Sequence, residues 1–396
     1  MMELSSRVKS VSPSATIAIS ARVRELKDEG VDVISFGAGE PDFATPPFIK
    51  QAAKDAIDAD DTKYTPRAGA KLKAAIVEKL KRENNLEYTP DEILVTFGGK
   101  HALYNAFTVL LEPDDKVLIP SPYWVSYPEQ VKLNGGQCVF IPTGIEKGFK
   151  ITPQDILEHA DDAKIIIINS PNNPTGITYS PEELKALADV ILQTDLIIFS
   201  DEIYEKLVYN GMKHVSFAAL DERLKDRTLT FNSYSKAYSM TGWRIGWVAG
   251  PKDVIKAMAT VGSHQTTNPV SFVQAAALAA YTDRDSSEAV EHMRMEFQKR
   301  GKHMHQRLNA LPGVKCLEPT GAFYCFPDVS AHYGKTLDGI EINNSLDFAR
   351  ACLELAHVAV VPGIAFGEDR CVRLSFATSM EQIDEGLNRL EKLLKE

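Results

Sequence analysis

Between Glu92 and Ala249, short apolar segments alternate with segments that have the periodicity of helices. Short apolar runs predict buried strands, and apolar residues spaced three and four positions apart predict helices that cover them. Strands and helices that alternate in this way form a mostly parallel sheet between two layers of helices. The predicted strands are Ile93–Phe97, Val117–Ile119, Cys138–Ile141, Ile165–Asn169, Leu196–Ser200, Leu229–Ser233 and Ile245–Ala249, and the predicted helices are Lys100–Leu111, Ser126–Leu133 and Pro181–Leu192.

The segments on either side of this region predict a second, smaller unit. A long helix is predicted at Ser286–Leu311, and further elements follow it and precede the sheet region. They are the helices Thr16–Asp28, Leu346–Ala356 and Glu381–Lys395, and the short strands Val31–Phe36, Ala322–Phe326 and Val372–Phe376. A helix predicted at Phe48–Ala59 belongs instead with the sheet region. We therefore expect an α/β protein with a large domain at residues 46–285 and a smaller α/β domain made of residues 1–45 and 286–396.

The segment FNSYSKAYSMTGWRIGWVAG, residues 231–250, places Lys236 among hydroxyl side chains and brings Arg244 eight residues later. A lysine held near buried surface loses hydration, which lowers the amine pKa from about 10.4 and frees the lone pair for Schiff-base chemistry. Hydroxyls such as that of Ser233, together with Arg244, are suitable donors to a phosphate. A reactive amine beside a phosphate site suggests pyridoxal phosphate, although a solvated lysine would also fit this segment alone.

Unusual residues follow several of the predicted strands, and ligands of open α/β sheets bind at the carboxyl ends of strands. Gly98 and Gly99 open a helix whose first amides could bind a phosphate. Asp201 ends a strand, and a buried carboxylate there needs a cationic partner such as a pyridinium nitrogen. Tyr204 follows three residues later, and Asn173 lies in SPNNPTG, which alone is typical of a simple turn. Their joint placement favours a pyridoxal phosphate site.

Composition excludes several other classes of protein. The chain has 396 residues and a formal net charge of -10, which disfavours nucleic acid and anionic membrane as partners. The five cysteines are scattered and form no C-x-x-C motif, so we expect neither disulfides nor a bound metal. No apolar run reaches the length of a membrane span. We expect a cytoplasmic protein.

An ordered set of motifs runs through nearly the whole chain: FGAGEPDF, KYTPRAG, GGKHAL, SPYWVSYPE, SPNNPTG, SDEIY, SKAYSMTGWRIG, GAFY and VRLSFAT. This set resembles the class I aminotransferases of the aspartate type. The resemblance implies the pyridoxal-phosphate fold type I, in which a large domain with a mostly parallel seven-stranded sheet is joined to a smaller domain. It also implies pyridoxal 5'-phosphate as cofactor, amino acids and 2-oxo acids as substrates, and a homodimer with shared active sites.

The resemblance implies a role for each matching residue. The lysine matching Lys236 binds the cofactor and carries a proton during catalysis, and the carboxylate matching Asp201 keeps the cofactor ring nitrogen protonated. Arg373, in VRLSFAT, matches the arginine that binds the substrate α-carboxylate. The other matching cofactor contacts are Gly98, Gly99, Lys100, Trp124, Asn173, Tyr204, Ser233, Arg244 and, from the neighbouring subunit, Tyr64; the other matching substrate contacts are Gly39, Lys100, Trp124 and Asn173.

Substrate choice depends on the group that binds a distal carboxylate. One branch of the family uses an arginine in the segment that reads GSHQTTNP here, where this chain has Ser263 and His264. A second branch uses the lysine of GGK, which matches Lys100. We therefore expect transfer of the amino group of L-aspartate to 2-oxoglutarate by a ping-pong mechanism. Members that also accept prephenate tend to carry a basic residue before Pro13, where this chain has Ser12.

Other functions stay open at this stage. Within the family, the alternatives are aminotransferases for alanine, aromatic amino acids, kynurenine or prephenate. From another class, Ser233 and Lys236 match the S-x-x-K of serine acyl-transfer enzymes. That chemistry also needs an S-D-N and a K-T-G motif later in the chain, and neither is present after Lys236. A non-enzymatic DNA-binding regulator of the same fold would need a basic helix, which the sequence does not offer.

Overall fold

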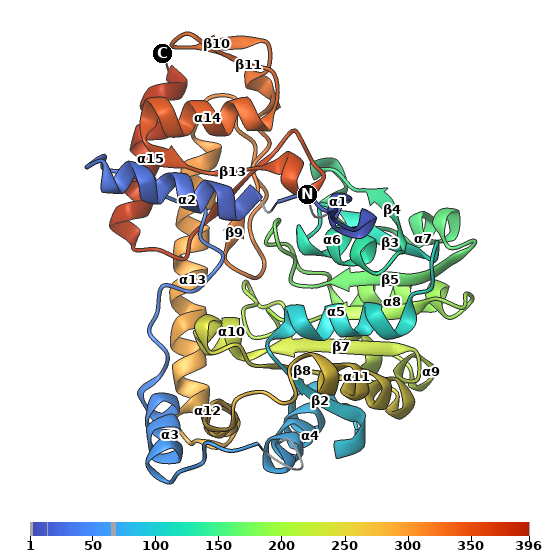
Figure 1. Cartoon of the computed structure of the whole chain (residues 1–396). Coiled ribbons are helices and arrows are strands. Elements are labelled where there is room, and N and C mark those ends of the chain that lie inside the picture. Colours follow the sequence, from blue (N-terminus) through green and yellow to red (C-terminus); the bar gives the residue numbers. More distant parts are fainter. Residues whose placement is uncertain (1–2, 14, 65–68, 396) are drawn as a thin grey trace.

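The computed structural model describes residues 3–13, 15–64 and 69–395, and a seven-stranded sheet is its largest element (Figure 1). The strand order is β2-β8-β7-β6-β5-β3-β4. The strands are β2 (Ile93–Thr96), β3 (Lys116–Ser121), β4 (Gln137–Pro142), β5 (Ala163–Asn169), β6 (Ile197–Asp201), β7 (Thr228–Ser233) and β8 (Gly246–Ala249). All pairs from β7 to β4 are parallel, whereas β8 runs antiparallel to both of its neighbours. The predicted mostly parallel, seven-stranded sheet is confirmed.

Side chains of β5 alternate between the two faces of this sheet, as successive residues of a strand must. Ile165 and Ile167 join one buried cluster, and Ile166 and Ile168 join another. The first cluster includes α5 (Gly99–Leu110), α6 (Ser126–Leu133) and α11 (Lys252–Gln265); the second includes α7 (Pro153–His159) and α8 (Pro181–Ile191). Because helices cover both faces, β5 is apolar along nearly its whole length.

A third buried cluster lies at the β2 end of the sheet. Here α3 (Pro47–Asp58), α4 (Ala70–Asn84) and α12 (Ser271–Thr282) pack together against β2 and β8. The α4 helix places Leu72, Ile76 and Leu80 on one buried face at a spacing of four residues. This cluster also covers the segment that carries Lys236, because Tyr234 and Ala237 belong to it.

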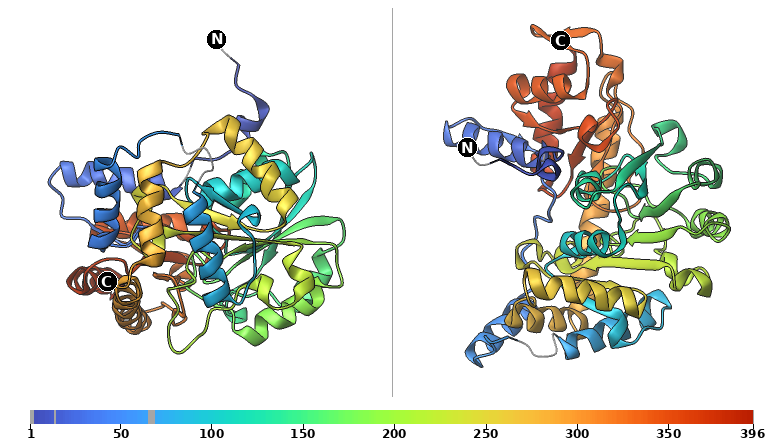
Figure 2. Two further views of the ribbon diagram at one scale, coloured as in Figure 1. Left: turned by 90° about the horizontal axis from the view of Figure 1, so that it is seen from below. Right: turned by 45° about the vertical axis from the view of Figure 1, so that its right-hand side comes forward.

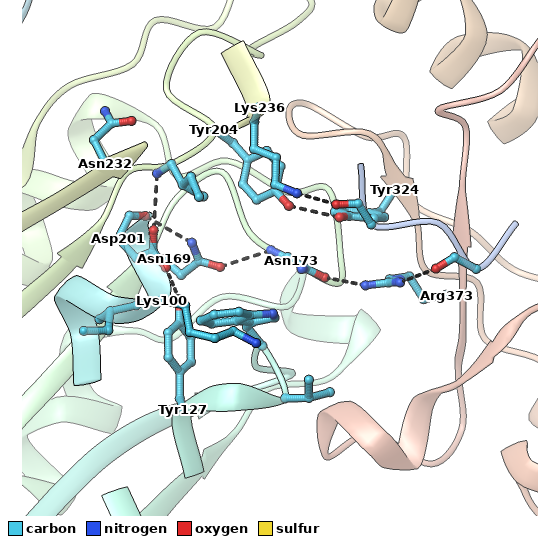
Figure 3. A pocket seen from close by; sticks show the side chains of 17 residues that line it. Lys100, Tyr127, Asn169, Asn173, Asp201, Tyr204, Asn232, Lys236, Tyr324 and Arg373 are labelled. Carbon is cyan, nitrogen blue, oxygen red and sulfur yellow. Dashed lines mark hydrogen bonds between the residues drawn. The ribbon is translucent and has the colours of Figure 1, made fainter. Parts of the chain in front are cut away.

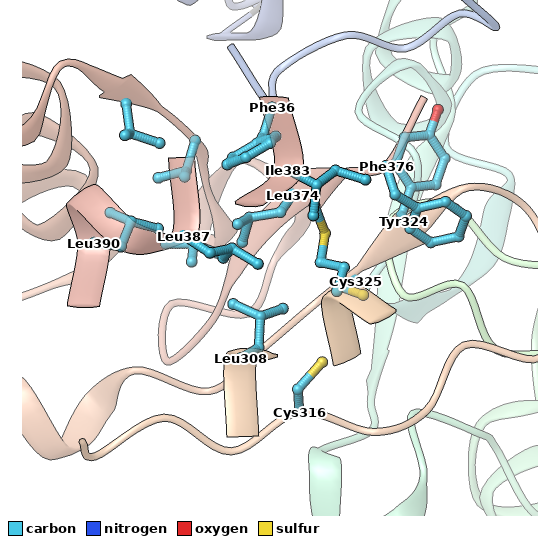
Figure 4. Close-up of a cluster of buried hydrophobic side chains, with 14 of the residues drawn as sticks. Phe36, Leu308, Cys316, Tyr324, Cys325, Leu374, Phe376, Ile383, Leu387 and Leu390 are labelled. Atoms are coloured by element: carbon cyan, nitrogen blue, oxygen red, sulfur yellow. The ribbon is translucent and has the colours of Figure 1, made fainter. Parts of the chain in front are cut away.

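A separate core lies beside the sheet and contains segments from both ends of the chain (Figure 4). Its antiparallel sheet has the order β13-β14-β9, and β1 pairs in parallel with β12. These strands are β1 (Ile34–Ser35), β9 (Tyr324–Cys325), β12 (Val358–Ala359), β13 (Val361–Pro362) and β14 (Val372–Ser375), and the helices are α14 (Ser345–Ala356) and α15 (Met380–Lys395). On α15, Ile383, Leu387, Leu390 and Leu394 form the buried stripe.

The helix α13 (Ser286–Asn309) runs past both parts of the molecule, as the views in Figures 1 and 2 show. Its first turns lie near α12, and its later turns pack against α15 and β9. Phe297 contributes to the core beside the sheet. This single helix therefore ties the two packed regions together.

Several predicted boundaries differ from the observed ones. The predicted strand Val31–Phe36 is shortened to Ile34–Ser35, because β12 pairs with only these two residues. The predicted helix Ser286–Leu311 ends at Asn309. All five cysteines are free thiols. No helix in the described part of the chain is long and apolar enough to cross a membrane.

Candidate active site

A cavity of about 340 Å³ opens where the carboxyl ends of β5, β6 and β7 face β14 and the β1 segment (Figure 3). Polar side chains from both packed regions meet in it. Its lining includes Gly37, Gly39, Gly99, Lys100, Trp124, Tyr127, Asn169, Asn173, Asp201, Tyr204, Asn232, Lys236, Tyr324 and Arg373. Nine of the predicted site residues are therefore brought together here: Gly39, Gly99, Lys100, Trp124, Asn173, Asp201, Tyr204, Lys236 and Arg373.

Lys236 lies on α10 (Tyr234–Ala237), a single turn that begins directly after β7. The turn starts at Ser233, whose hydroxyl accepts a hydrogen bond from the Ser235 amide at 3.1 Å. The Lys236 ammonium reaches across the cavity and donates to the Gly39 carbonyl. Burial, with a smaller contribution from Arg373, lowers the pKa of this amine to about 7, although Glu40 opposes the shift. A large share of the amine is therefore neutral, and thus nucleophilic, near neutral pH.

Asp201 is the last residue of β6 and is buried at the bottom of the cavity. Burial raises the pKa of its carboxyl to about 6, while hydrogen bonds from Tyr127 and from the Ile203 amide lower it. The Tyr127 hydroxyl donates to Oδ2 at 2.5 Å. Within the described ranges, no lysine, arginine or histidine forms an ion pair with this carboxylate. A cationic ligand would therefore stabilise its charged form.

Arg373 lies in the middle of β14 and is almost fully buried. Its two terminal nitrogens donate to Asn173 Oδ1 and to the Gly37 carbonyl, each at 3.0 Å. Its Nε is buried and has no hydrogen-bond partner among the residues described. Burial lowers the pKa of the guanidinium, which nevertheless stays a cation. A buried guanidinium that lacks an anionic partner is suited to bind a carboxylate.

The amino end of α5 offers a site for a phosphate. Gly98 precedes the helix with φ 84° and ψ 168°, a conformation open almost only to glycine. A Cβ added to Gly98 would lie 2.7 Å from a guanidinium nitrogen of Arg244. Helix amides and an arginine side chain thus converge on one place, where an anion would be favoured. Ser235 and Arg244 line the neighbouring mouth of the cavity.

Ser233 lies beside the amino end of α5, because a Cβ added to Gly99 would be 3.9 Å from the Cβ of Ser233, and its contact with a phosphate stays a prediction. Its hydroxyl lies 2.9 Å from the Ile245 carbonyl and 2.8 Å from the Ser235 hydroxyl, and the side chain is buried. It does not line the cavity, and Ser235 lines only the neighbouring mouth. The predicted contact would need this hydroxyl to leave its present partners.

Lys100 extends along the side of the cavity opposite Lys236 in Figure 3, and Trp124 lines the same cavity. The Lys100 ammonium lies 4.9 Å from the centre of the Trp124 ring, a cation–π distance. Burial, followed by repulsion from Arg244, lowers the pKa of Lys100. No carboxylate in the described ranges forms an ion pair with it, so a second unpaired cation faces the cavity.

Two predicted tyrosines lie in contrasting positions. Tyr204 is buried, and its hydroxyl is 2.9 Å from that of Tyr324. Tyr64 is 82% exposed and is not part of the cavity lining. Its role at a neighbouring subunit stays a prediction, and residues 65–68 of the motif KYTPRAG lie outside the described residues.

The structure also brings in cavity residues to which sequence reasoning gave no role: Gly37, Tyr127, Asn169, Asn232 and Tyr324. Tyr127 and Tyr324 lie within the motifs SPYWVSYPE and GAFY, so the motifs contained the signal. Asn169 ends β5, one strand away from Asp201. Its position could have been found from the strand-end argument that identified Asp201.

Comparison with known proteins places the chain in a family. The sequence model described as "Aminotransferase class I and II" matches residues 31–390. The chain belongs to this aminotransferase family. It is 48% identical to "Aspartate aminotransferase" of Bacillus subtilis (strain 168), over 100% of this chain and 99% of that protein. It is also 48% identical to "Aspartate/prephenate aminotransferase" of Cereibacter sphaeroides, over 99% of this chain and 98% of that protein.

Solved structures agree with this assignment. The aspartate aminotransferase of Thermus thermophilus, determined with maleate, superposes with a TM-score of 0.93 at 44% identity and covers 100% of both chains. The aminotransferase described here is thus a pyridoxal-phosphate-dependent enzyme of fold type I. The residues present fit that cofactor, because a buried amine of lowered pKa, an aspartate without a cationic partner and an anion site at α5 surround one cavity.

The serine acyl-transfer alternative is wrong. That chemistry requires the serine and lysine of S-x-x-K to act on each other. Here the Ser233 hydroxyl contacts Ile245 and Ser235, and the Lys236 ammonium contacts Gly39. The family assignment independently makes the chain an aminotransferase.

Proposed function

We propose that this aminotransferase moves the amino group of L-aspartate to 2-oxoglutarate, giving oxaloacetate and L-glutamate. The observation that carries the proposal is the pair of cations, Arg373 and Lys100, that face one cavity without carboxylate partners among the described residues. Aspartate and 2-oxoglutarate each carry two carboxylates. The names of the relatives support this substrate class, and maleate, bound by the Thermus thermophilus enzyme, is likewise a dicarboxylate.

In this proposal the two cations divide the work. Arg373 binds the α-carboxylate, with Asn173 holding one of its terminal nitrogens in place. The Gly37 carbonyl accepts from the other terminal nitrogen. The Nε–H and the remaining N–H groups of the guanidinium are left to bind the carboxylate. Lys100 binds the distal carboxylate, and the Trp124 ring beneath it fixes the direction in which the ammonium points.

Lys236 is the proton carrier of the proposed site. Its amine pKa of about 7 lets it take up and release a proton near neutral pH with little cost in either direction.

Pyridoxal phosphate, when bound, supplies an electron sink that stabilises negative charge at the Cα of an amino acid. Asp201 would hold its ring nitrogen, Lys236 its aldehyde carbon, and Trp124 would cover the ring. Gly98, Gly99, Ser233 and Arg244 would hold its phosphate. Tyr204 and Asn173 would hold its phenolic oxygen. Each of these roles follows from the matching motifs and from the position of the residue in or beside the cavity.

We further propose a homodimer in which Tyr64 completes the site of the other subunit, because a tyrosine that is 82% exposed is available to a partner. We also propose that residues 46–285 form one domain and that residues 1–45 and 286–396 form the other. The five free cysteines are compatible with a reducing, cytoplasmic location.

Prephenate is the second candidate substrate, since the Cereibacter sphaeroides relative is named for it. The position before Pro13 argues against it. The Ser12 amide donates to the Glu129 carboxylate at 2.9 Å, so this position has a neighbouring negative charge and no basic side chain. A further carboxylate would be repelled there.

The test replaces Lys100 with Met and compares four amino donors. The value of kcat/KM for aspartate and glutamate should fall by about 10- to 100-fold, as expected when a charge-assisted hydrogen bond worth about 1.5–3 kcal/mol is lost. Alanine and phenylalanine should change by less than about threefold, because they have no distal carboxylate. Lys132→Met, on the neighbouring helix α6, is the control for the change in net charge. Equal losses for all four donors would contradict the role of Lys100.

A further inference from the structure

A buried polar network lies next to β7 and joins α4 to the segment that follows β6. At its centre is the carboxylate of Glu205, which is buried with the fully buried Lys79 of α4. The Lys79 ammonium donates to Glu205 Oε1 and, at 2.7 Å, to Asn84 Oδ1. The Asn84 amide donates to Glu205 Oε2 at 3.0 Å. Three hydrogen bonds thus join the side chains of Lys79, Asn84 and Glu205.

Lys79 favours the charged form of the Glu205 carboxylate. Burial alone would raise the pKa of Glu205, but Lys79 and more distant cations outweigh it and lower the pKa to about 2. Glu202, Glu205 and His214 could in principle hold a metal ion. The ammonium of Lys79 already supplies the cation at Glu205, and the Glu202 carboxylate accepts from the hydroxyls of Ser200 and Ser216. The cluster is therefore better described as an ion pair with its hydrogen-bonding partners than as a metal site.

One further contact connects the network to the cavity. Asn232, the residue of β7 that lines the cavity, donates from Nδ2 to Glu205 Oε1 at 2.8 Å. Its Oδ1 accepts a hydrogen bond from the Ser233 amide at 2.7 Å. A carboxylate can only accept and an amide N–H can only donate, so these two neighbours fix the orientation of the Asn232 side chain.

Ser233 is the residue on which the position of Lys236 depends. It ends β7 and begins α10, a helix of four residues that has few hydrogen bonds of its own. Ser233 is held by its amide, through Asn232, and by its hydroxyl, through Ile245. A displacement of Ser233 would be passed to Lys236 three residues later.

A buried ion pair is a poor means of stabilising a fold, because desolvation of the two charges offsets their attraction. A matched apolar pair would commonly serve as well. The contacts of Glu205 suit another role. Its carboxylate accepts a hydrogen bond from Asn232 of β7, and the Lys79 ammonium keeps that carboxylate charged.

We propose that Glu205, held by Lys79, is a positioning residue for Lys236 that acts through Asn232 and the Ser233 amide. The proposal rests on the proposed function of Lys236 as the residue that binds the cofactor. It assigns a role in the reaction to Glu205 and Lys79, which do not line the cavity.

The test measures how fast the apoenzyme attaches pyridoxal phosphate, followed by visible absorbance, together with kcat for aspartate and the midpoint of thermal unfolding. Two double variants are compared. K79M/E205Q removes both charges but keeps an amide oxygen that can accept from Asn232, so its attachment rate should stay within about threefold of the wild type. K79M/E205L removes the acceptor as well, and its attachment rate and kcat should both fall by about tenfold or more.

A purely structural role predicts another pattern. The two double variants would then differ in the midpoint of thermal unfolding while attaching the cofactor at equal rates, and that result would overturn the proposal. Ser216→Ala is the matched control, since it removes a buried hydroxyl that bonds Asn84 but leaves the contacts of Glu205 with Lys79 and Asn232. It should attach the cofactor at the wild-type rate.

Asn232→Ala keeps the test decisive if a double variant does not fold. It leaves the ion pair intact and removes the link to Ser233, so attachment should again slow by about tenfold. A wild-type rate in this variant would also overturn the proposal. Borohydride reduction and peptide mapping of the wild-type enzyme separate the function proposed for Lys236 from the positioning role proposed for Glu205. A label away from Lys236 would refute the proposed function. A label at Lys236 leaves only the positioning role to be tested by the variants.

Discussion

Burial sets the chemistry of the ionisable side chains in the cavity, and it acts in opposite directions on acids and bases. It lowers the pKa of Lys236 to about 7 and raises that of Asp201 to about 6. Both groups therefore titrate close to neutral pH, as groups that exchange protons or respond to a charged ligand should. Tyr127 adjusts this balance, since its hydroxyl stabilises the charged form of Asp201.

Tyr127→Phe should shift the acid limb of activity to higher pH. The lost hydroxyl donates to the carboxylate, so its removal favours the protonated form and raises the pKa of Asp201. A hydrogen bond to a charged group is worth about 1.5–3 kcal/mol, which corresponds to a rise of about one pKa unit or more. The measurement is kcat/KM for aspartate as a function of pH.

Tyr123→Phe is the control for this prediction, because Tyr123 lies in the loop just before α6, the helix that carries Tyr127, and stacks on Phe140. Its pH profile should coincide with that of the wild type. An acid limb of Tyr127→Phe that does not move, or moves to lower pH, would show that the hydroxyl does not stabilise the charged carboxylate.

The sequence allowed prediction of site residues that are charged but lie in or at the end of an apolar strand. Asp201 ends an apolar strand and was therefore expected to need a cationic partner, whereas Arg373 was found through the motif VRLSFAT. Tyr127 gave no such signal, because a buried tyrosine is ordinary in a core. The capping of α10 by Ser233 could not be predicted either, because local sequence does not contain the pairing of β7 with β8.

At the scale of elements, the turn between β2 and α5 depends on Gly98. Its backbone conformation is costly for other residues by about 1–3 kcal/mol, and an added Cβ would collide with the Arg244 guanidinium. We expect Gly98→Ala to weaken the binding of pyridoxal phosphate by about tenfold or more, because it displaces both the helix amides and Arg244. Equilibrium titration of the apoenzyme measures this.

Gly30→Ala separates the collision from the backbone strain. Gly30 has φ +86°, and an added Cβ there would meet nothing within 4 Å. It should cost about 1–2 kcal/mol of stability but leave cofactor affinity unchanged. If both variants lost the same stability and neither lost affinity, the turn at Gly98 would have no part in binding the phosphate.

The elements of the central sheet were predictable because β5 and its neighbours are covered on both faces and are therefore continuously apolar. The helix α12 was missed for a related reason: it is rich in alanine and apolar on most sides, so it lacks a clear polar face. The two-residue strand β1 is defined by its partner β12, which follows more than 300 residues later, and local sequence does not contain that pairing.

At the scale of the whole molecule, one chain builds most of a site but leaves Tyr64 outside it. The cavity joins the carboxyl ends of the sheet to Arg373 of β14, so both packed regions are needed for a dicarboxylate to bind. Tyr64 is exposed and does not line the cavity. A second copy of the chain related by twofold symmetry would give each tyrosine the same place in the opposite site.

This arrangement predicts that two inactive variants restore each other. In a hybrid of Tyr64→Ala and Lys236→Ala subunits, the site that retains Lys236 receives an intact Tyr64 from its partner, whereas the other site lacks both. With random pairing, half of the dimers are hybrids and half of their sites are complete, so an equal mixture refolded together should recover about a quarter of wild-type activity. The control is the same mixture combined without refolding, in which subunits do not exchange. If Tyr64 served its own subunit, no hybrid site would be complete, and refolding would add nothing to the average of the two variants.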